Sequence, residues 1–124
     1  MEEFKQSKIA ELKEYIQRKD RDIKDSPERH IFYVVKLNTL ENLAKITGDN
    51  SYYSEAVEFA DLSMEKFPFI SDFPLKKCQY LLALGDKVSA KDCIEKTILH
   101  TTWSDFQDSY NKSLFEKIKR QVSN

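Results

Sequence analysis

Residues that interrupt regular structure are scarce in this chain, and this scarcity constrains its fold more than any single motif does. The 124 residues include two glycines and three prolines. Sheets built from short strands need many turn residues, whereas long helices joined by short loops need few. Both glycines, Gly48 and Gly85, precede an aspartate, and glycine is the usual left-handed stop after a helix. The pattern therefore predicts an all-α fold.

Apolar residues recur at helical spacing in six segments between these breaks. The first segment ends in the charged run 18–25, which we expect to be a solvated connector. Ser26 and Pro27 favour the start of the second helix, because serine caps free backbone N–H groups and proline suits the first helical position. Ser104 and Gln107 suit a capping box at the start of the last helix. The expected helices cover about residues 2–19, 26–48, 51–67, 71–85, 87–100 and 104–122.

A helix–turn–helix pattern repeats in the sequence with a 34-residue period. Ala90 lies one period after Ala56, and each of these alanines follows a helix that ends in Gly-Asp. The same shift aligns three further pairs, which are Ala60 with Ile94, Ser63 with Thr97, and Met64 with Ile98. A fixed period of this length indicates stacked supersecondary units.

This unit resembles the tetratricopeptide repeat (TPR), which has the same period. Ala90 and Ile94 match the family's small residue early in the second helix and its bulky apolar residue four positions later. Ala56 and the terminal Pro68 match the same pattern in the first unit, although Ala60 is small where a large residue is usual. Small residues at these positions let paired helices approach closely.

The resemblance covers about residues 35–102 and implies an architecture for the whole chain. It implies a single domain over residues 1–124, built as a right-handed stack of about six antiparallel helices, a TPR-like α-solenoid. Terminal repeats need caps with one polar side. Helices at 2–19 and 104–122 would serve as these caps.

In this family the first helices of the units line a concave groove that holds an extended peptide or a partner helix. The resemblance implies that the groove would be lined here by Asn38, Asn42, Lys45, Leu75, Lys76, Gln79 and Leu82. Asparagines one helical turn apart suit a peptide backbone, because each side-chain amide offers both a donor and an acceptor. An ordinary solvated surface is the alternative interpretation of the same polar residues.

The stretch FPFISDFP, residues 67–74, is unusually apolar for a connection between helices. We expect most of it to fold under as core. If Phe69 or Phe73 is exposed, it is the best candidate for an interface hot spot, since exposed apolar patches mark interaction sites.

No residue pattern indicates catalysis, a cofactor or a metal site. With glycine only at positions 48 and 85, the chain has no Gly-rich phosphate loop, and its two histidines stand in different helices. Cys78 and Cys93 are fifteen residues apart, which is neither a zinc spacing nor a disulfide framework. We therefore expect two buried thiols in a reducing cytoplasm.

The charge balance indicates which partners to expect. A net charge of −1 gives no electrostatic footprint for nucleic acid or an anionic membrane, and no apolar run approaches the ~20 residues that span a bilayer. The first fifteen residues contain no signal-peptide core, which favours a cytoplasmic protein. We expect a non-catalytic adaptor or scaffold for a protein or peptide, with homodimer formation as a further option. A dedicated inhibitor or immunity-type regulator, toxin-neutralising or phage-encoded, is the alternative.

Overall fold

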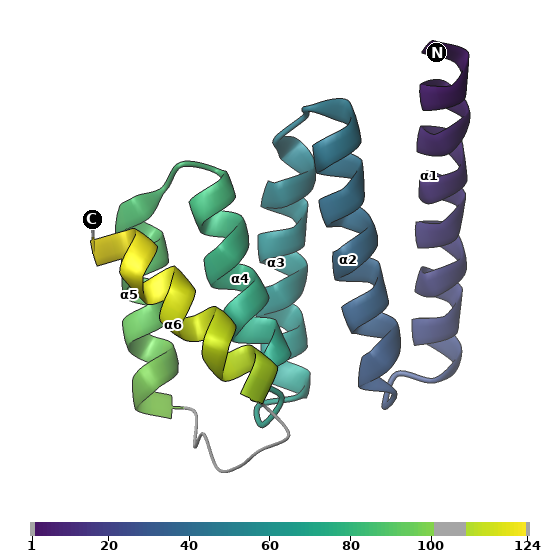
Figure 1. Cartoon of the computed structure of the whole chain (residues 1–124). Coiled ribbons are helices and arrows are strands. Elements are labelled where there is room, and N and C mark those ends of the chain that lie inside the picture. Colours follow the sequence, from purple (N-terminus) through teal and green to yellow (C-terminus); the bar gives the residue numbers. More distant parts are fainter. Residues whose placement is uncertain (1, 101–108, 124) are drawn as a thin grey trace. The chain divides into compact units, whose positions relative to one another are not determined.

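All secondary structure in the described part of the chain is α-helical. The computed structural model describes the backbone of residues 2–100 and 109–123, and the side chains of residues 2–97 and 113–123. Its helices (Figure 1) are α1 (Glu2–Asp25), α2 (His30–Thr47), α3 (Ser51–Lys66), α4 (Asp72–Ala83), α5 (Lys87–His100) and α6 (Ser109–Ser123). The all-α prediction is confirmed for these residues.

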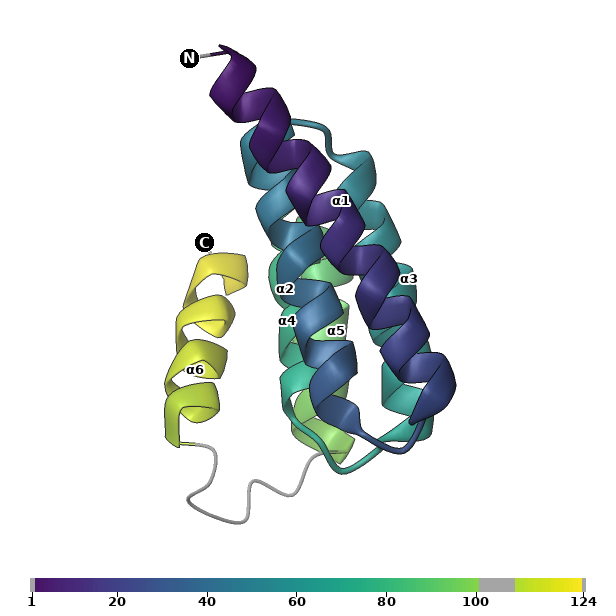
Figure 2. The same ribbon diagram turned by 90° about the vertical axis from the view of Figure 1, so that its right-hand side faces the viewer.

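The helices belong to two compact units, Met1–Ala56 and Val57–Asn124, whose boundary falls within α3. In the first unit α1 packs antiparallel to α2 (Figure 1). In the second unit α4 packs antiparallel to α5, and α6 crosses that pair (Figure 1). It lies on one side of the pair (Figure 2) and contacts both helices. Most of this packing is between sequence neighbours, and the contact of α4 with α6 is the exception.

The first helix is longer than its sequence indicated, because α1 continues through the charged run to Asp25. The prediction of a solvated connector at 18–25 is therefore wrong. Charges in this run have partners on α2: Lys36 Nζ lies 2.7 Å from Asp20 Oδ1, and Lys19 Nζ lies 5.2 Å from the centre of the Phe32 ring. Long side chains can cover apolar surface with their stems while their charged ends stay paired or solvated. Such contacts with α2 favour the continuation of α1 as a helix to Asp25 over a loop.

The second helix begins later than expected. Ser26 does not cap it; the Ser26 carbonyl instead accepts the Arg29 N–H at 3.2 Å, which closes a turn. Helix α2 begins at His30, after an extended Arg29 that makes no side-chain cap hydrogen bond. The Tyr33 hydroxyl donates to the Pro27 carbonyl at 2.9 Å and holds the turn against the helix.

The core of the second unit lies among α4, α5 and α6. Its buried side chains are Leu75, Cys78, Ala90, Cys93, Ile94, Phe115, Ile118 and Val122. Apolar residues four apart predict a stripe at Leu114, Ile118 and Val122 on the last helix. Phe115 lies outside this stripe, and it is buried because α6 contacts two helices rather than one. The capping box predicted at Ser104 and Gln107 lies outside the described residues.

The two Gly-Asp turns share the same local chemistry. Gly48 (φ 71°) and Gly85 (φ 81°) both occupy the left-handed region, which glycine enters without steric cost. The next residue then bonds to the start of the following helix: Asp49 Oδ1 accepts the Ser51 N–H at 2.9 Å, and Asp86 Oδ1 accepts the Ser89 N–H at 3.0 Å. These hydrogen bonds from the backbone lower the pKa of both aspartates.

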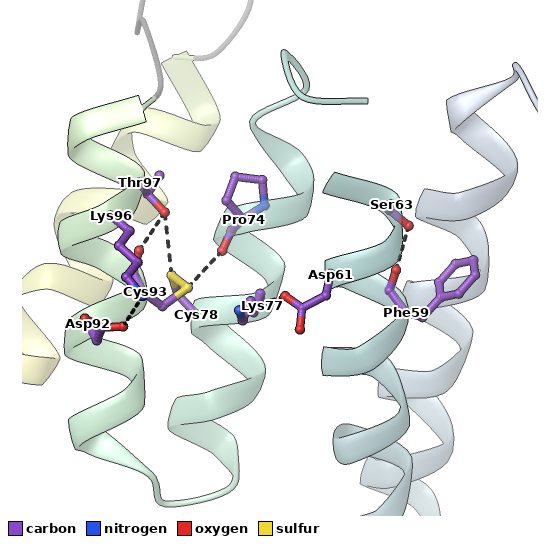
Figure 3. Close-up of polar contacts among 10 residues, drawn as sticks. All are labelled: Phe59, Asp61, Ser63, Pro74, Lys77, Cys78, Asp92, Cys93, Lys96 and Thr97. Carbon is purple, nitrogen blue, oxygen red and sulfur yellow. Dashed lines mark hydrogen bonds and ion pairs between the residues drawn. A yellow bond between two sulfur atoms is a disulfide. The ribbon is translucent and has the colours of Figure 1, made fainter. Parts of the chain in front are cut away.

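The 34-residue recurrence in sequence is also a recurrence in burial and hydrogen bonding. The aligned pairs Ala56 and Ala90, Ala60 and Ile94, and Ser63 and Thr97 are all buried. The Ser63 hydroxyl donates to the Phe59 carbonyl and the Thr97 hydroxyl donates to the Cys93 carbonyl, both at 2.8 Å (Figure 3). Phe59 and Cys93 are themselves related by the same period, so both buried hydroxyls are satisfied in the same way.

Candidate functional site

The predicted groove residues of α2 form one exposed stripe in the first unit. Asn38, Asn42 and Lys45 are all exposed, and their spacing of four and three residues places them on the same helix face. Lys45 Nζ donates a hydrogen bond of 2.8 Å to Glu41 Oε2, and this bond raises the pKa of Lys45. This half of the predicted set is accessible to a partner.

The predicted groove residues of α4 are less accessible. Leu75 is buried in the core shared by α4, α5 and α6, and Leu82 packs against the same core. Lys76 and Gln79 are half-buried, and Gln79 and Leu82 line a hollow of about 440 Å³ together with Gln121 of α6. Leu75 is therefore a core residue rather than the groove residue that the family resemblance implied, because α6 packs where the resemblance placed an open surface.

The two phenylalanines proposed as hot spots have opposite environments. Phe69, in the connection between α3 and α4, is 92% exposed, the largest value among the exposed apolar side chains that the structure describes. Phe73 is fully buried, and its ring centre lies 5.9 Å from that of Phe67. Phe73 is a core residue because it falls in the first turn of α4, so only Phe69 meets the condition of exposure.

An apolar pocket of about 310 Å³ lies in the second unit beside this connection. Its apolar lining comes from the end of α3, the connection and the first turn of α4: Met64, Phe67, Pro68, Ile70 and Pro74. The rest of the lining is polar or sulfur-bearing: Lys77, Cys93, Lys96 and Thr97. Small-molecule sites are usually apolar pockets of about this size or larger, with a few polar groups at defined places.

A disulfide joins Cys78 of α4 to Cys93 of α5, with the two Cα atoms 5.6 Å apart. The prediction of two free thiols is therefore wrong. The two sulfurs differ in access, since Cys93 lines the pocket whereas Cys78 is completely buried. Each sulfur has an oxygen neighbour (Figure 3): Thr97 Oγ1 lies 4.0 Å from Cys78 Sγ, and the Pro74 carbonyl oxygen lies 3.7 Å from Cys93 Sγ.

A signal for this pairing was present in the sequence. Cys78 lies seven residues before Gly85, and Cys93 lies seven residues after Asp86. In an antiparallel helical hairpin, residues equidistant from the turn lie at the same height along the two axes, because both helices rise by the same amount per residue. The equal distances from the Gly-Asp turn therefore bring the two cysteines to the same level, where close helix packing allows a bond.

Two lysines contribute positive charge to the pocket. Lys77 Nζ lies 2.7 Å from Asp61 Oδ1, and Lys96 Nζ lies 2.9 Å from Asp92 Oδ2 (Figure 3). Both lysines line the pocket and neither aspartate does. The pocket thus combines apolar walls, one sulfur of a disulfide and the positive ends of two ion pairs.

No protein-family model, curated protein or solved structure matches this chain. The TPR resemblance consequently depends on the residues themselves. Within the ranges that the structure describes, no group of three or more His, Cys, Asp or Glu residues could hold a metal ion. Among the described helices, none is both long and apolar enough to cross a membrane.

Proposed function

We propose that this chain is a non-catalytic protein–protein interaction module, a small adaptor or scaffold that binds a peptide or a partner helix. One observation carries the proposal: Phe69 is almost fully exposed beside an apolar pocket in the same unit. Aromatic side chains are enriched at interfaces, and exposed apolar surface beside a pocket is typical of docking sites. Burial of one phenylalanine removes roughly 150 Å² or more of surface from water.

We also propose that the two Gly-Asp hairpins are degenerate TPR-like units of a right-handed stack within a single domain. The 34-residue recurrence of buried alanines and backbone-bonded hydroxyls, each preceded by a turn with a left-handed glycine, supports this. In such a stack the exposed stripe Asn38, Asn42 and Lys45 would be a second binding surface. The more specific function of a dedicated inhibitor stays a prediction, since no described residue favours it over an adaptor.

The proposed cytoplasmic location has to accommodate the Cys78–Cys93 disulfide. Stable disulfides belong mainly to oxidising compartments, and cytosolic ones are usually transient or redox-sensing. In the cytoplasm this bond would therefore open and close reversibly. Rapid acid quenching of native cells, followed by thiol alkylation and mass spectrometry, would measure the fraction of disulfide that persists there.

Capture from an extract of the native source, with quantitative mass spectrometry, tests the interaction proposal. The wild-type chain and the Phe69→Ala variant serve as baits, and Phe4→Ala is the matched control because Phe4 is also highly exposed, at 77%. We expect Phe69→Ala to lower the yield of the specific partner about tenfold or more, as expected for a hot spot. Phe4→Ala should retain that yield.

The double variant Asn38→Ala, Asn42→Ala tests the α2 stripe in the same experiment. Loss of the partner with this variant but not with Phe69→Ala would move the binding surface to α2. Retention of the same proteins by every variant would contradict the proposal. Light scattering of the purified chain, with and without Phe69→Ala, would show whether the partner is a second copy.

A further inference from the structure

One cysteine of the disulfide lines the pocket and the other does not. Cys93 is 7% exposed and contributes to the lining, whereas Cys78 is completely buried and does not. Thiol–disulfide exchange requires a thiolate to reach one sulfur, and access decides which sulfur is attacked. A thiol that enters from solvent through the pocket therefore meets Cys93.

The charge of the lining selects among thiols. Lys77 and Lys96 lie on the two helices that the disulfide joins, and both contribute to the pocket (Figure 3). Each is paired with an aspartate outside the lining, so the charged residues of the lining itself are both lysines. A cleft lined by one sign of charge raises the local concentration of molecules of the opposite sign.

From these two observations we infer that the pocket is a modification site, at which a small anionic thiol of the glutathione class forms a mixed disulfide with Cys93. The thiolate sulfur attacks Cys93 Sγ, the bond to Cys78 breaks, and Cys78 departs with the electron pair as a thiolate. Cys78 then takes a proton from water, which replaces the proton that the entering thiol released. One disulfide is exchanged for another, so no separate oxidant is consumed.

The products also have partners in the structure. The protonated Cys78 thiol can donate to Thr97 Oγ1, which lies 4.0 Å from Cys78 Sγ. The carboxylates of the attached thiol can pair with Lys77 and Lys96, which line the pocket. A second attack by Cys78 on the mixed disulfide would restore the original bond, so the modification is reversible.

Three small thiols of similar size and different charge test the inference on the intact oxidised chain. The probes are 2-sulfanylethanesulfonate (anionic), 2-sulfanylethanol (neutral) and cysteamine (cationic), compared at equal thiolate concentration and low ionic strength. We expect the anionic thiol to open the disulfide about threefold faster than the neutral one, and cysteamine to be the slowest. Peptide mapping after acid quenching and alkylation should find the adduct of each thiol, and of glutathione, on Cys93.

Charge variants provide the matched control. Lys77→Gln with Lys96→Gln should abolish the advantage of the anionic thiol over the neutral one, because the two substitutions remove the positive charges of the lining. Lys87→Gln with Lys91→Gln removes two exposed lysines of α5 that do not line this pocket. This control should keep the wild-type order of rates.

A second measurement uses the single-cysteine variants and the symmetrical disulfide of each probe. Cys93 in the Cys78→Ala variant should take the adduct at least about tenfold faster than Cys78 in the Cys93→Ala variant, because reactivity follows exposure. Adducts that form first on Cys78, rates that ignore thiol charge, or opening that requires denaturant would each overturn the inference.

Discussion

The two Gly-Asp turns of this protein repeat the same local design, but the helices that flank them differ in covalent linkage. Both have a left-handed glycine, an aspartate that bonds to the start of the next helix, a buried alanine and a hydroxyl bonded to the preceding turn. Only the hairpin of α4 and α5 carries a covalent bond between its helices among the described residues. Equivalent sequence positions therefore do not carry equivalent stabilisation.

The residues at equivalent positions explain the difference. Counted by the 34-residue period, Ala44 of α2 corresponds to Cys78 and Phe59 of α3 corresponds to Cys93. Neither of these positions holds a cysteine, so the earlier repeat has no side chains that could form the same bond. The period thus relates the small residues and the buried hydroxyls of the two repeats, and it does not extend to the covalent bond.

Removal of the disulfide should produce the largest effect and should separate the two hairpins most clearly. Cross-linking residues fifteen apart stabilises a protein by roughly 3 kcal/mol, mainly because it restricts the unfolded chain. Urea unfolding followed by circular dichroism should show that loss on reduction with dithiothreitol. Hydrogen exchange should show weaker protection in α4 and α5 and little change in α2.

The double variant Cys78→Ala, Cys93→Ala is the control for this experiment. It should resemble the reduced wild-type chain and should not respond to dithiothreitol. An unchanged urea midpoint after complete reduction, with both thiols titrated, would show that the bond contributes nothing to the second hairpin.

Overpacking of the buried alanines should have the next largest effect and should show where the hairpins are alike. Ala56→Leu and Ala90→Leu each insert three carbon atoms at a fully buried position, which costs about 1–3 kcal/mol. Both variants should lower the melting temperature measured by circular dichroism. Val88→Leu, at a position that is 82% exposed on α5, should stay within about 0.5 kcal/mol of wild type. A melting temperature unaffected by Ala90→Leu would contradict the close helix packing that the repeat implies at this position.

The sequence predicted the elements whose ends are encoded locally. The ends of α2 and α4 follow from Gly48 and Gly85, since a left-handed stop depends on one residue. The extension of α1 through 18–25 was missed, because it depends on partners such as Lys36 that lie on another helix. The late start of α2 was missed for a similar reason, since Ser26 is used in a turn instead of a cap.

The candidate site was less predictable because it depends on packing between helices. Leu75 satisfies the spacing of a groove residue, yet it is buried once α6 packs on α4 and α5. Phe69 and Phe73 are four residues apart and chemically identical, and only the start of α4 makes one core and the other exposed. The disulfide had a signal in its symmetry about Gly85 and Asp86, but cysteine count and spacing alone did not favour it.

Titration of the two turn aspartates should give the smallest effect and the finest comparison of the hairpins. Backbone and hydroxyl bonds from Ser51 and Ser89 lower the pKa of Asp49 and Asp86 below the ordinary value of 3.8. A group whose pKa is lower in the folded state contributes stability above its unfolded pKa, and that contribution is lost as pH falls through the folded value. The contribution should therefore disappear below about pH 4, and it should be small because both carboxylates are exposed.

Asn replaces Asp in these turns without removing the cap, since its side-chain oxygen accepts the same backbone N–H but does not titrate in this range. Melting temperatures of Asp49→Asn and Asp86→Asn, measured from pH 6 down to about pH 2, should fall less steeply with acid than those of the wild type. Because the two turns make the same bond at 2.9 Å and 3.0 Å, the two variants should flatten the curve to a similar extent. A flatter curve for Asp86→Asn alone would show that only the second turn depends on its carboxylate. The two turns would then share the left-handed glycine but not the stabilisation by aspartate.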